Sequence, residues 1–381
     1  MSTLRRGLEA FAEDATAWRQ AVGARVPVYD RLLGAAVGLI LRPEGALETA
    51  ARDRLEAAWR ERRSSAAYDR PLLLMAALRA EALRAGPRHP LFAAIGADPV
   101  DPGAARREAL AAALADAPAR LFADLAIRSV QTNETSRALA WLWPAALAGV
   151  GDHRRPLALF DIGCSGGLNL TAEGLPARWT DAAGAPLPVA SAARIVSREG
   201  FDAHPLDVGR GDDVVWLRAC VWPGETDRLA RLDRAIGIFL QASSGTNPPR
   251  LHIADVADIP ARLARRAAEL PADTLLLAYQ TVMRDYLPEP RQKRYLTEMN
   301  AWVAAEAAGG PRRIWIELEA GPPADPQAPP MVLTAHVSTG AAAEGARAIP
   351  LARCGYHPDR LMLDAGGVAA FVESLTRDRK S

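Results

Sequence analysis

The chain has 381 residues, more than one hydrophobic core usually organises, so two domains or one elaborated domain are expected. Hydrophobic residues make up 49% of it and charged residues 24%, which excludes a largely disordered chain. The formal net charge of +1 argues against a broad nucleic-acid-binding surface. The three cysteines are far apart and form no CxxC pair, so we expect neither a disulfide framework nor a metal site.

The N-terminal segment predicts a cytoplasmic protein. Its first twenty residues carry charged side chains of both signs, so the apolar core of a secretory signal cannot form. No stretch of the sequence reaches the ~20 consecutive apolar residues that a membrane-spanning helix needs. We therefore expect no membrane partner, and the sequence leaves the oligomeric state open.

Residues 1–150 predict helices only. Apolar side chains recur every three or four positions between residues 4 and 22, which is the spacing of one helix face. Further helical patterns cover residues 29–41, 46–62, 71–85 and 104–114. No alternating strand pattern interrupts them, so we expect an all-α domain over residues 1–150 that caps the rest of the protein.

A polar segment, VQTNETSR, precedes the last helix of this part. It is compatible with an ordinary helix start in which Thr132 or Asn133 caps the first turn. Alternatively, Gln131, Glu134 and Arg137 are spaced three apart and would present polar groups to a binding site from one helix face. The segment alone does not decide between capping and binding.

From residue 151 onward, short apolar runs alternate with helical patterns. The contiguous apolar run at residues 157–162 predicts a central strand covered on both faces. Further strands are predicted at residues 192–197, 250–254, 274–279, 313–317, 331–338 and 348–354, with helices at 168–175, 214–220, 225–240, 259–270 and 290–308. This alternation predicts parallel βαβ units and a second, α/β domain over residues 151–381.

The turn after the first of these strands, DIGCSGG, carries the strongest functional signal. A strand, a glycine turn and a helix open a doubly wound α/β domain. The spacing of Asp161, Gly163, Ser165 and Gly167 resembles the acid-x-Gly-x-Gly-x-Gly motif of S-adenosylmethionine-dependent methyltransferases, with Ser165 in place of the middle glycine.

Three further residues fit the same resemblance. Asp202 lies in GFDAHP, which resembles the Gly-x-Asp-x-x-Pro that often closes the second strand of these enzymes, where the acid binds the ribose hydroxyls. Asp255, after the next predicted strand, resembles the third motif, and Asn169 follows the turn directly. The resemblance implies a Rossmann-like class I methyltransferase sheet with S-adenosylmethionine as cofactor.

Other interpretations of the glycine turn remain open. Nicotinamide dinucleotides need Gly-x-Gly-x-x-Gly, and the glycines here are out of phase with that pattern. GCSGG matches the Gly-x-Ser-x-Gly of serine hydrolases, with Ser165 as nucleophile and Asp285 and His336 or His357 as its partners, although no strand pattern precedes residue 157. A glycine turn also needs no cofactor chemistry, so a non-catalytic nucleoside-binding or ligand-binding protein on the same fold is the runner-up.

Methyl transfer to a protonated nucleophile needs a base, which should lie at the carboxyl ends of the strands. The residues that the sequence offers there are Tyr279, Gln280, Asp285, Tyr286, Glu317, Glu319 and His357. From these we take Tyr279, Asp285 and His357 as the catalytic candidates. The near-neutral charge, and the absence of an Asn-Pro-Pro-Tyr motif after the fourth strand, argue against nucleic-acid methylation. A small molecule or a peptide is the expected substrate.

Several blocks of the sequence together resemble one family. The blocks VQTNETSR, DIGCSGGLNL, REGFDAHPLDV, VWLRACVWPGETDRLARL and residues 354–357 resemble the signature of domain of unknown function 2332, a resemblance that runs from about residue 10 to about residue 375. It implies a methyltransferase-like Rossmann domain behind a helical N-terminal part. It also implies that Gln131, Asn133, Glu134 and Arg137 face the ligand rather than only capping a helix.

Overall fold

The computed structural model is a mixed α/β protein with one nine-stranded sheet and many helices. The structure describes residues 7–60, 62, 69–131, 133–150, 155–176, 178–306, 310–322, 327–339 and 345–376. The chain forms two compact units. Residues 1–132 and 209–230 make up the helical unit, and residues 133–208 and 231–381 make up the sheet unit.

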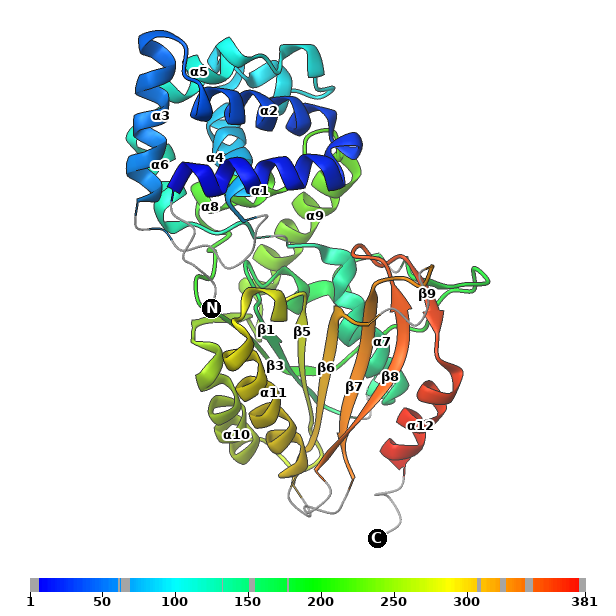
Figure 1. Ribbon diagram of the computed structural model, residues 1–381. Coiled ribbons are helices and arrows are strands. Elements are labelled where there is room, and N and C mark those ends of the chain that lie inside the picture. Colours follow the sequence, from blue (N-terminus) through cyan, green and yellow to red (C-terminus); the bar gives the residue numbers. More distant parts are fainter. Residues whose placement is uncertain are drawn as a thin grey trace. The chain divides into compact units, whose positions relative to one another are not determined.

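The helical unit has helices at all the predicted places. They are α1 (Gly7–Val22), α2 (Pro27–Leu41), α3 (Gly45–Trp59), α4 (Asp69–Ala85) and α5 (Arg107–Ala115), with α6 (Ala119–Ile127) as a helix that was not predicted (Figure 1). The apolar stripe of α1 is buried as its spacing requires, and Phe11 stacks on Trp59 with 5.2 Å between ring centroids. Among the described residues before residue 150, none lies in a strand.

The sheet unit contains all the predicted strands. They are β1 (Leu157–Ile162), β3 (Ile195–Asp202), β4 (Arg250–Ile253), β5 (Leu275–Thr281), β6 (Arg312–Ala320), β7 (Met331–Ser338) and β8 (Ala346–Cys354). The strand predicted at residues 192–197 is shifted toward the C-terminus and runs through Asp202 as β3. Two short strands, β2 (Thr180–Asp181) and β9 (Arg360–Leu363), were not predicted.

The strands lie in the order β2-β9-β8-β7-β6-β5-β1-β3-β4. Strands β1, β3, β4, β5 and β6 are parallel, β7 is antiparallel to β6, and β8 is antiparallel to β7. β7 therefore runs opposite to the parallel strands, while β8 runs in the same direction as they do. The chain moves outward in one direction from β1 through β3 to β4 and in the other from β5 to β6, so the strand order reverses between β1 and β5.

Both faces of the central strand are covered, as its apolar sequence predicts. All six residues of β1 are buried. Leu157 and Leu159 belong to a core that includes residues of α7 (Leu139–Leu147) and α12 (Ala365–Thr376). Ala158 and Phe160 belong to a core with residues of α10 (Ile259–Glu269) and α11 (Glu289–Ala304) on the other face (Figure 1). We call the edge where β1, β3, β4, β5, β6 and β8 end the carboxyl edge.

The compact units do not divide at residue 150, where the sequence predicts a boundary. Helix α7 is apolar on all sides and its residues join the core beneath β5 and β6, so residues 133–150 belong to the sheet unit. Pro144 lies inside this helix. The sequence of α7 alone does not show which unit it joins, because a helix that is apolar all round can be buried against helices or against a sheet.

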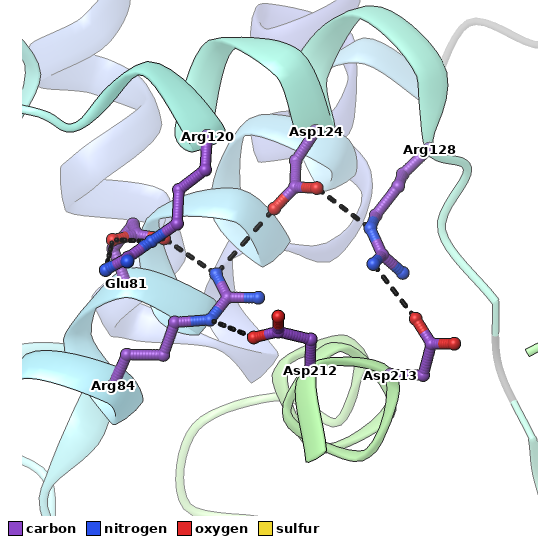
Figure 2. A network of polar contacts seen from close by, with 7 residues as sticks. All are labelled: Glu81, Arg84, Arg120, Asp124, Arg128, Asp212 and Asp213. Atoms are coloured by element: carbon purple, nitrogen blue, oxygen red, sulfur yellow. Dashed lines mark hydrogen bonds and ion pairs between the residues drawn. The ribbon is translucent and has the colours of Figure 1, made fainter. Parts of the chain in front are cut away.

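Residues 209–230 return to the helical unit in the middle of the α/β sequence. They hold α8 (Gly211–Cys220) and the start of α9 (Thr226–Ser243). Alternating charges bind α8 to α4 and α6, as Figure 2 shows: Arg84 pairs with Asp212 at 3.2 Å, and Arg128 pairs with Asp213 at 2.9 Å. The Trp216 indole N–H also donates to the Ser129 carbonyl at 3.1 Å. Helix α8 lies between β3 and β4 in the sequence, where a crossover helix of the sheet is expected, but it is part of the helical unit.

Helix α12 packs so closely on β8 that one glycine has no room for a side chain. A Cβ on Gly367 would lie 1.8 Å from the Pro350 carbonyl oxygen, whereas one on Gly366 would lie 3.5 Å from its nearest atom, Asp364 Oδ1. We expect Gly367→Ala to lower the free energy of unfolding by about 1–3 kcal/mol or more, as overpacking does. Gly366→Ala should be neutral or stabilise by up to about 1 kcal/mol, since alanine favours helix. Urea unfolding of both variants measures the difference, and equal effects would contradict the close packing.

Candidate functional site

The glycine turn follows β1 at the carboxyl edge, next to the point where the strand order reverses. Gly163 and Gly167 have φ angles of 77° and 68°, which favour glycine, and Ser165 has a φ of 52°. A Cβ on Gly163 would lie 2.9 Å from Met283, and one on Gly167 would lie 2.5 Å from Leu251. Both glycines are thus required by the close approach of neighbouring side chains as well as by the backbone.

Asp202 holds this turn in place from the end of β3. Its Oδ2 accepts the Ser165 backbone N–H at 2.9 Å, and its Oδ1 accepts the His204 backbone N–H at 2.8 Å. Each carboxylate oxygen has a further lone pair, so these two bonds do not exhaust its capacity as an acceptor. Asp202, which the sequence predicts to bind ribose hydroxyls, thus bridges the turn after β1 to the loop after β3.

A buried acid lies beside the strand reversal. Asp161 and Tyr279 are register partners on β1 and β5, and the Tyr279 hydroxyl donates to Asp161 Oδ2 at 2.8 Å. Burial raises the pKa of Asp161 to about 7; the tyrosine hydrogen bond opposes this rise, and the negative charge of Asp202 adds to it. Burial, and then the Asp161 charge, raise the pKa of Tyr279 well above its ordinary value. Near neutral pH this carboxyl group can exist in either form, and a nearby cation would favour the ionised one.

The polar segment at residues 133–137 lies against the 3-10 helix η7 (Leu168–Gly174) that follows the glycine turn. Asn169 donates from Nδ2 to the Glu134 carbonyl oxygen at 3.5 Å, and the Trp141 indole N–H donates to the Asn169 carbonyl oxygen at 2.8 Å. Asn133 Nδ2 and Asn169 Oδ1 are buried without a hydrogen-bond partner among the described residues. Such buried polar atoms are costly, so they mark places where a ligand or water can bind.

Glu134 and His357 meet at this segment. The Glu134 side chain is only 2% exposed, and its Oε2 lies 3.0 Å from Nδ1 of His357, in the loop between β8 and β9. Glu134 Oε1 accepts the Ser136 backbone N–H at 3.1 Å and lies 3.9 Å from Nη2 of Arg231. The Arg137 Nε–H donates to the Tyr356 carbonyl oxygen at 3.1 Å. Two residues of the segment thus hold the loop that carries His357.

The segment begins a helix, as the capping interpretation predicts, but with a different cap residue. Glu134 is the N-cap of the 3-10 helix that precedes α7, in place of the predicted Asn133, while Thr132 lies outside the described residues. Glu134 and Arg137 are also buried in polar contacts. Gln131 belongs to the helical unit, where its backbone hydrogen-bonds the Cys220 thiol.

Two predicted residues lie apart from these contacts. Asp255 is exposed at the end of the outer strand β4; its pKa is lowered by the Ala257 backbone N–H and then by an ion pair with Arg291. Asp285 is exposed on a short 3-10 helix after β5. Neither has a described contact with the glycine turn.

A second polar network is buried on the opposite face, under α11. Gln280 on β5 donates from Nε2 to Glu317 at 3.1 Å and to Glu319 at 2.8 Å, and accepts the Tyr295 hydroxyl at 2.5 Å. His336 uses both ring nitrogens, Nε2 toward Glu317 at 2.7 Å and Nδ1 toward Asn300 at 3.1 Å. The strand-end residues Gln280, Glu317 and Glu319 are therefore fixed in the core.

Glu319 connects that network to the carboxyl edge. Its Oε1 accepts the backbone N–H groups of Met283 at 3.0 Å and Arg284 at 3.3 Å, in the loop after β5. Val282 in this loop has a φ of 53°, a strained value for a β-branched residue. Burial raises the pKa of Glu319 to about 7, against hydrogen bonds that lower it. The strained loop places Met283 over Gly163.

In the part of the chain that the structure describes, no three His, Cys, Asp or Glu side chains are grouped as a metal ion would require. Among the helices so described, none combines the length and apolar character needed to span a membrane.

A comparison with protein-family models matches residues 25–362 to the family described as "Uncharacterized protein conserved in bacteria (DUF2332)". The chain belongs to the DUF2332 family. A search of curated proteins finds no match, and neither does a search of solved structures.

One member of the site in this DUF2332 chain is not predicted from the sequence. Arg231 lies in the block that ends in DRLARL, and that block is the signal that could have found it. Its guanidinium has an ion pair with Glu134 at 3.9 Å, and its buried Nε makes no hydrogen bond with a described residue. An arginine on an amphipathic helix otherwise looks like a solvated surface residue.

The raised pKa of Asp161 makes stability depend on pH. The folded chain holds the neutral form up to about pH 7, whereas the unfolded chain ionises near the ordinary value of 3.8. Stability from this group is thus fully present below the unfolded pKa and is lost as pH rises through about 7. Each unit of pKa difference is worth about 1.4 kcal/mol. Over this rise in pH the free energy of unfolding of the parent should therefore fall by several kcal/mol relative to that of Asp161→Asn, which keeps the acceptor for Tyr279.

Urea midpoints of the parent and of Asp161→Asn at pH 5, 6, 7 and 8 measure this effect. We expect the variant to gain stability over the parent between pH 5 and pH 7 and the difference to level off at pH 8. Parallel curves for the two proteins would show that Asp161 is ionised throughout.

Proposed function

We propose that this chain is an S-adenosylmethionine-dependent methyltransferase that acts on a small molecule or a peptide. The observation that carries the proposal is the glycine turn after β1. This turn lies at the reversal of the strand order, and its Ser165 N–H donates to Asp202 at the end of β3. Ligands of open α/β sheets bind outside the carboxyl ends of the strands at such a reversal.

The sheet supports this proposal in its central part. The order β4-β3-β1-β5-β6, all parallel and followed by the antiparallel β7, resembles the Rossmann-like class I methyltransferase sheet. β8, β9 and β2 extend the sheet beyond that pattern. The acids Asp161, Asp202 and Asp255 lie at the carboxyl ends of three adjacent strands, in the order that the sequence motifs imply.

The residues at the turn suit the cofactor. S-adenosylmethionine would supply a methyl group on a positively charged sulfur, together with an amino group and ribose hydroxyls. Asp161 is a buried carboxyl that a cation would ionise, and Asp202 has acceptor capacity left for hydroxyl groups. Asn169 Oδ1 is a buried acceptor that lacks a partner among the described residues and could take an N–H from the ligand. A protein that binds the nucleoside without catalysis would use the same groups.

One observation favours a serine hydrolase, which is the second candidate. Ser165 has the left-handed backbone that a nucleophile on a strand-to-helix turn adopts. Against it, β1 is the first strand in the described part of the chain, and both nitrogens of His336 are engaged by Glu317 and Asn300. His357 contacts Glu134, and its Nε2 makes no hydrogen bond with any described residue, Ser165 included. Methyl transfer therefore accounts for more of the site.

Two substitutions separate these functions. Asp202→Ala removes a charged acceptor, worth about 1.5–3 kcal/mol, so affinity for S-adenosylmethionine and S-adenosylhomocysteine should fall roughly 10–150-fold. Ser165→Ala should change affinity little, because the turn contributes its backbone N–H. Asp258→Ala is the control, since Asp258 is an exposed acid of the same unit. Calorimetric titration measures affinity, and thermal melting checks that each variant is folded.

The hydrolase predicts the reverse result. A fluorophosphonate probe would label Ser165 in the parent but not in Ser165→Ala, and Asp202→Ala would leave that labelling intact. Labelling at Ser165, or nucleoside affinity that is indifferent to Asp202, would overturn the methyltransferase proposal.

A further inference from the structure

The imidazole of His357 is held in one orientation by a buried carboxylate. Glu134 Oε2 lies 3.0 Å from Nδ1 of His357. A carboxylate only accepts hydrogen bonds, so Nδ1 carries the hydrogen and, in the neutral ring, Nε2 keeps the lone pair. The other oxygen of Glu134 accepts the Ser136 N–H and faces Arg231, which balances its charge.

The opposite nitrogen of the ring is available for chemistry. The His357 side chain is 40% exposed, and its Nε2 has no hydrogen-bond partner among the described residues. The loop that carries it is fixed at the neighbouring residue, where Arg137 donates to the Tyr356 carbonyl. A carboxylate that fixes Nδ1–H while Nε2 stays open is the arrangement that enzymes use for histidine bases.

The dyad lies at the edge where the proposed cofactor would bind. β8 runs parallel to β1, so the loop after β8 leaves the sheet at the carboxyl edge, as the glycine turn does. The dyad is also linked to the glycine turn. Glu134, which orients His357, accepts a hydrogen bond on its carbonyl oxygen from Asn169, and Asn169 lies in η7, directly after the turn. Asp285, another catalytic candidate, is exposed on a helix after β5 and has no such partner.

We infer that His357 is the general base of the proposed methyl transfer and that Glu134 is its positioning residue. The inference rests on the proposed function and narrows its substrate to a nucleophile that carries a proton at neutral pH, an O–H or N–H group. A thioether, which has no proton to lose, would need no base. The group X–H would give its proton to Nε2, and the electron pair of that bond would stay on X and form the new bond to the methyl carbon. The bond from that carbon to the sulfonium sulfur would break at the same time, with its electron pair going to sulfur, so that S-adenosylhomocysteine leaves as a neutral thioether. The exposed imidazolium would return the proton to water.

The orientation of His357 is tested without substrate. Nitrogen-15 NMR of the labelled parent at pH 8 should show a histidine with hydrogen on Nδ1 and none on Nε2, and that signal should vanish in His357→Gln. Glu134→Gln keeps an acceptor and should keep the signal, whereas Glu134→Ala should lose it and show Nε2–H. Asp258→Ala is the matched control. An Nε2–H form in the folded parent would overturn the dyad.

The role as a base is tested by transfer and rescue. Radiolabelled S-adenosylmethionine is given to the protein with a mixture of small molecules and peptides that carry hydroxyl and amine groups. His357→Ala should transfer label roughly 10²–10⁴-fold more slowly than the parent, and added imidazole should restore part of the rate. Its calorimetric affinity for S-adenosylhomocysteine should stay within about twofold of the parent, because a base near the substrate contributes little to cofactor binding.

The outcomes separate the two proposals. If the parent binds neither S-adenosylmethionine nor S-adenosylhomocysteine, the methyltransferase proposal fails and the base fails with it, whatever the NMR shows. If the parent binds and transfers label but His357→Ala does so at the parental rate, or imidazole restores nothing, only the base is overturned. If the parent binds but labels nothing in the mixture, the O–H or N–H substrate class is overturned.

Discussion

Carboxylates that accept backbone N–H groups hold the loops at the carboxyl edge of the sheet. Asp202 fixes the glycine turn through Ser165, Glu319 fixes the loop after β5 through Met283 and Arg284, and Glu134 fixes the segment before α7 through Ser136. A hydrogen bond to a charged group contributes more than a neutral one, and leaving a buried N–H without a partner is costly. The glycine turn, the loop after β5 and the segment before α7 are thus each held by one acid.

This way of holding loops lets the edge contain strained backbone. Ser165 and Val282 both have positive φ angles. The Ser165 N–H is itself accepted by Asp202, and Val282 lies in the loop that Glu319 fixes through the Met283 N–H. Strain of this kind costs about 1–3 kcal/mol per residue and persists only where the surroundings determine it. Asp161 and Glu319 add a second cost, because burial raises the pKa of each to about 7. Stability has thus been given up at the carboxyl edge, where function is expected.

The polar groups on the two faces of the sheet differ in how their hydrogen-bonding capacity is used. On the face of α7, Asp161 and Tyr279 lie beside the reversal, and Glu134 leaves one histidine nitrogen open. On the face of α11, Gln280 joins the acids of β6 and His336 into a network whose described members satisfy one another, so that network supports the sheet. A histidine with both nitrogens engaged and one with a single engaged nitrogen are therefore suited to different roles.

Much of the architecture could be predicted from local patterns. The apolar run at residues 157–162 marks a strand buried on both faces, and the stripe in α1 marks a helix with one buried side. The unit boundary could not be predicted in this way. α7 is apolar all round, and α8 has the pattern of a crossover helix; which core each joins depends on contacts such as Arg84 with Asp212 that are distant in sequence.

The candidate site, like the fold, could be predicted from the sequence only in part. By itself the sequence determined which residues are candidates for chemistry: the turn at 161–167, the acids after two strands, the polar segment and His357, because motif spacing and residue type are local properties. It did not determine which of them meet. Glu134 and His357 are 223 positions apart (357 − 134), and only the parallel direction of β8 and the burial of α7 under the sheet bring them within 3.0 Å. Tertiary structure decided this pairing because hydrogen bonds depend on distance in space, which sequence separation does not set.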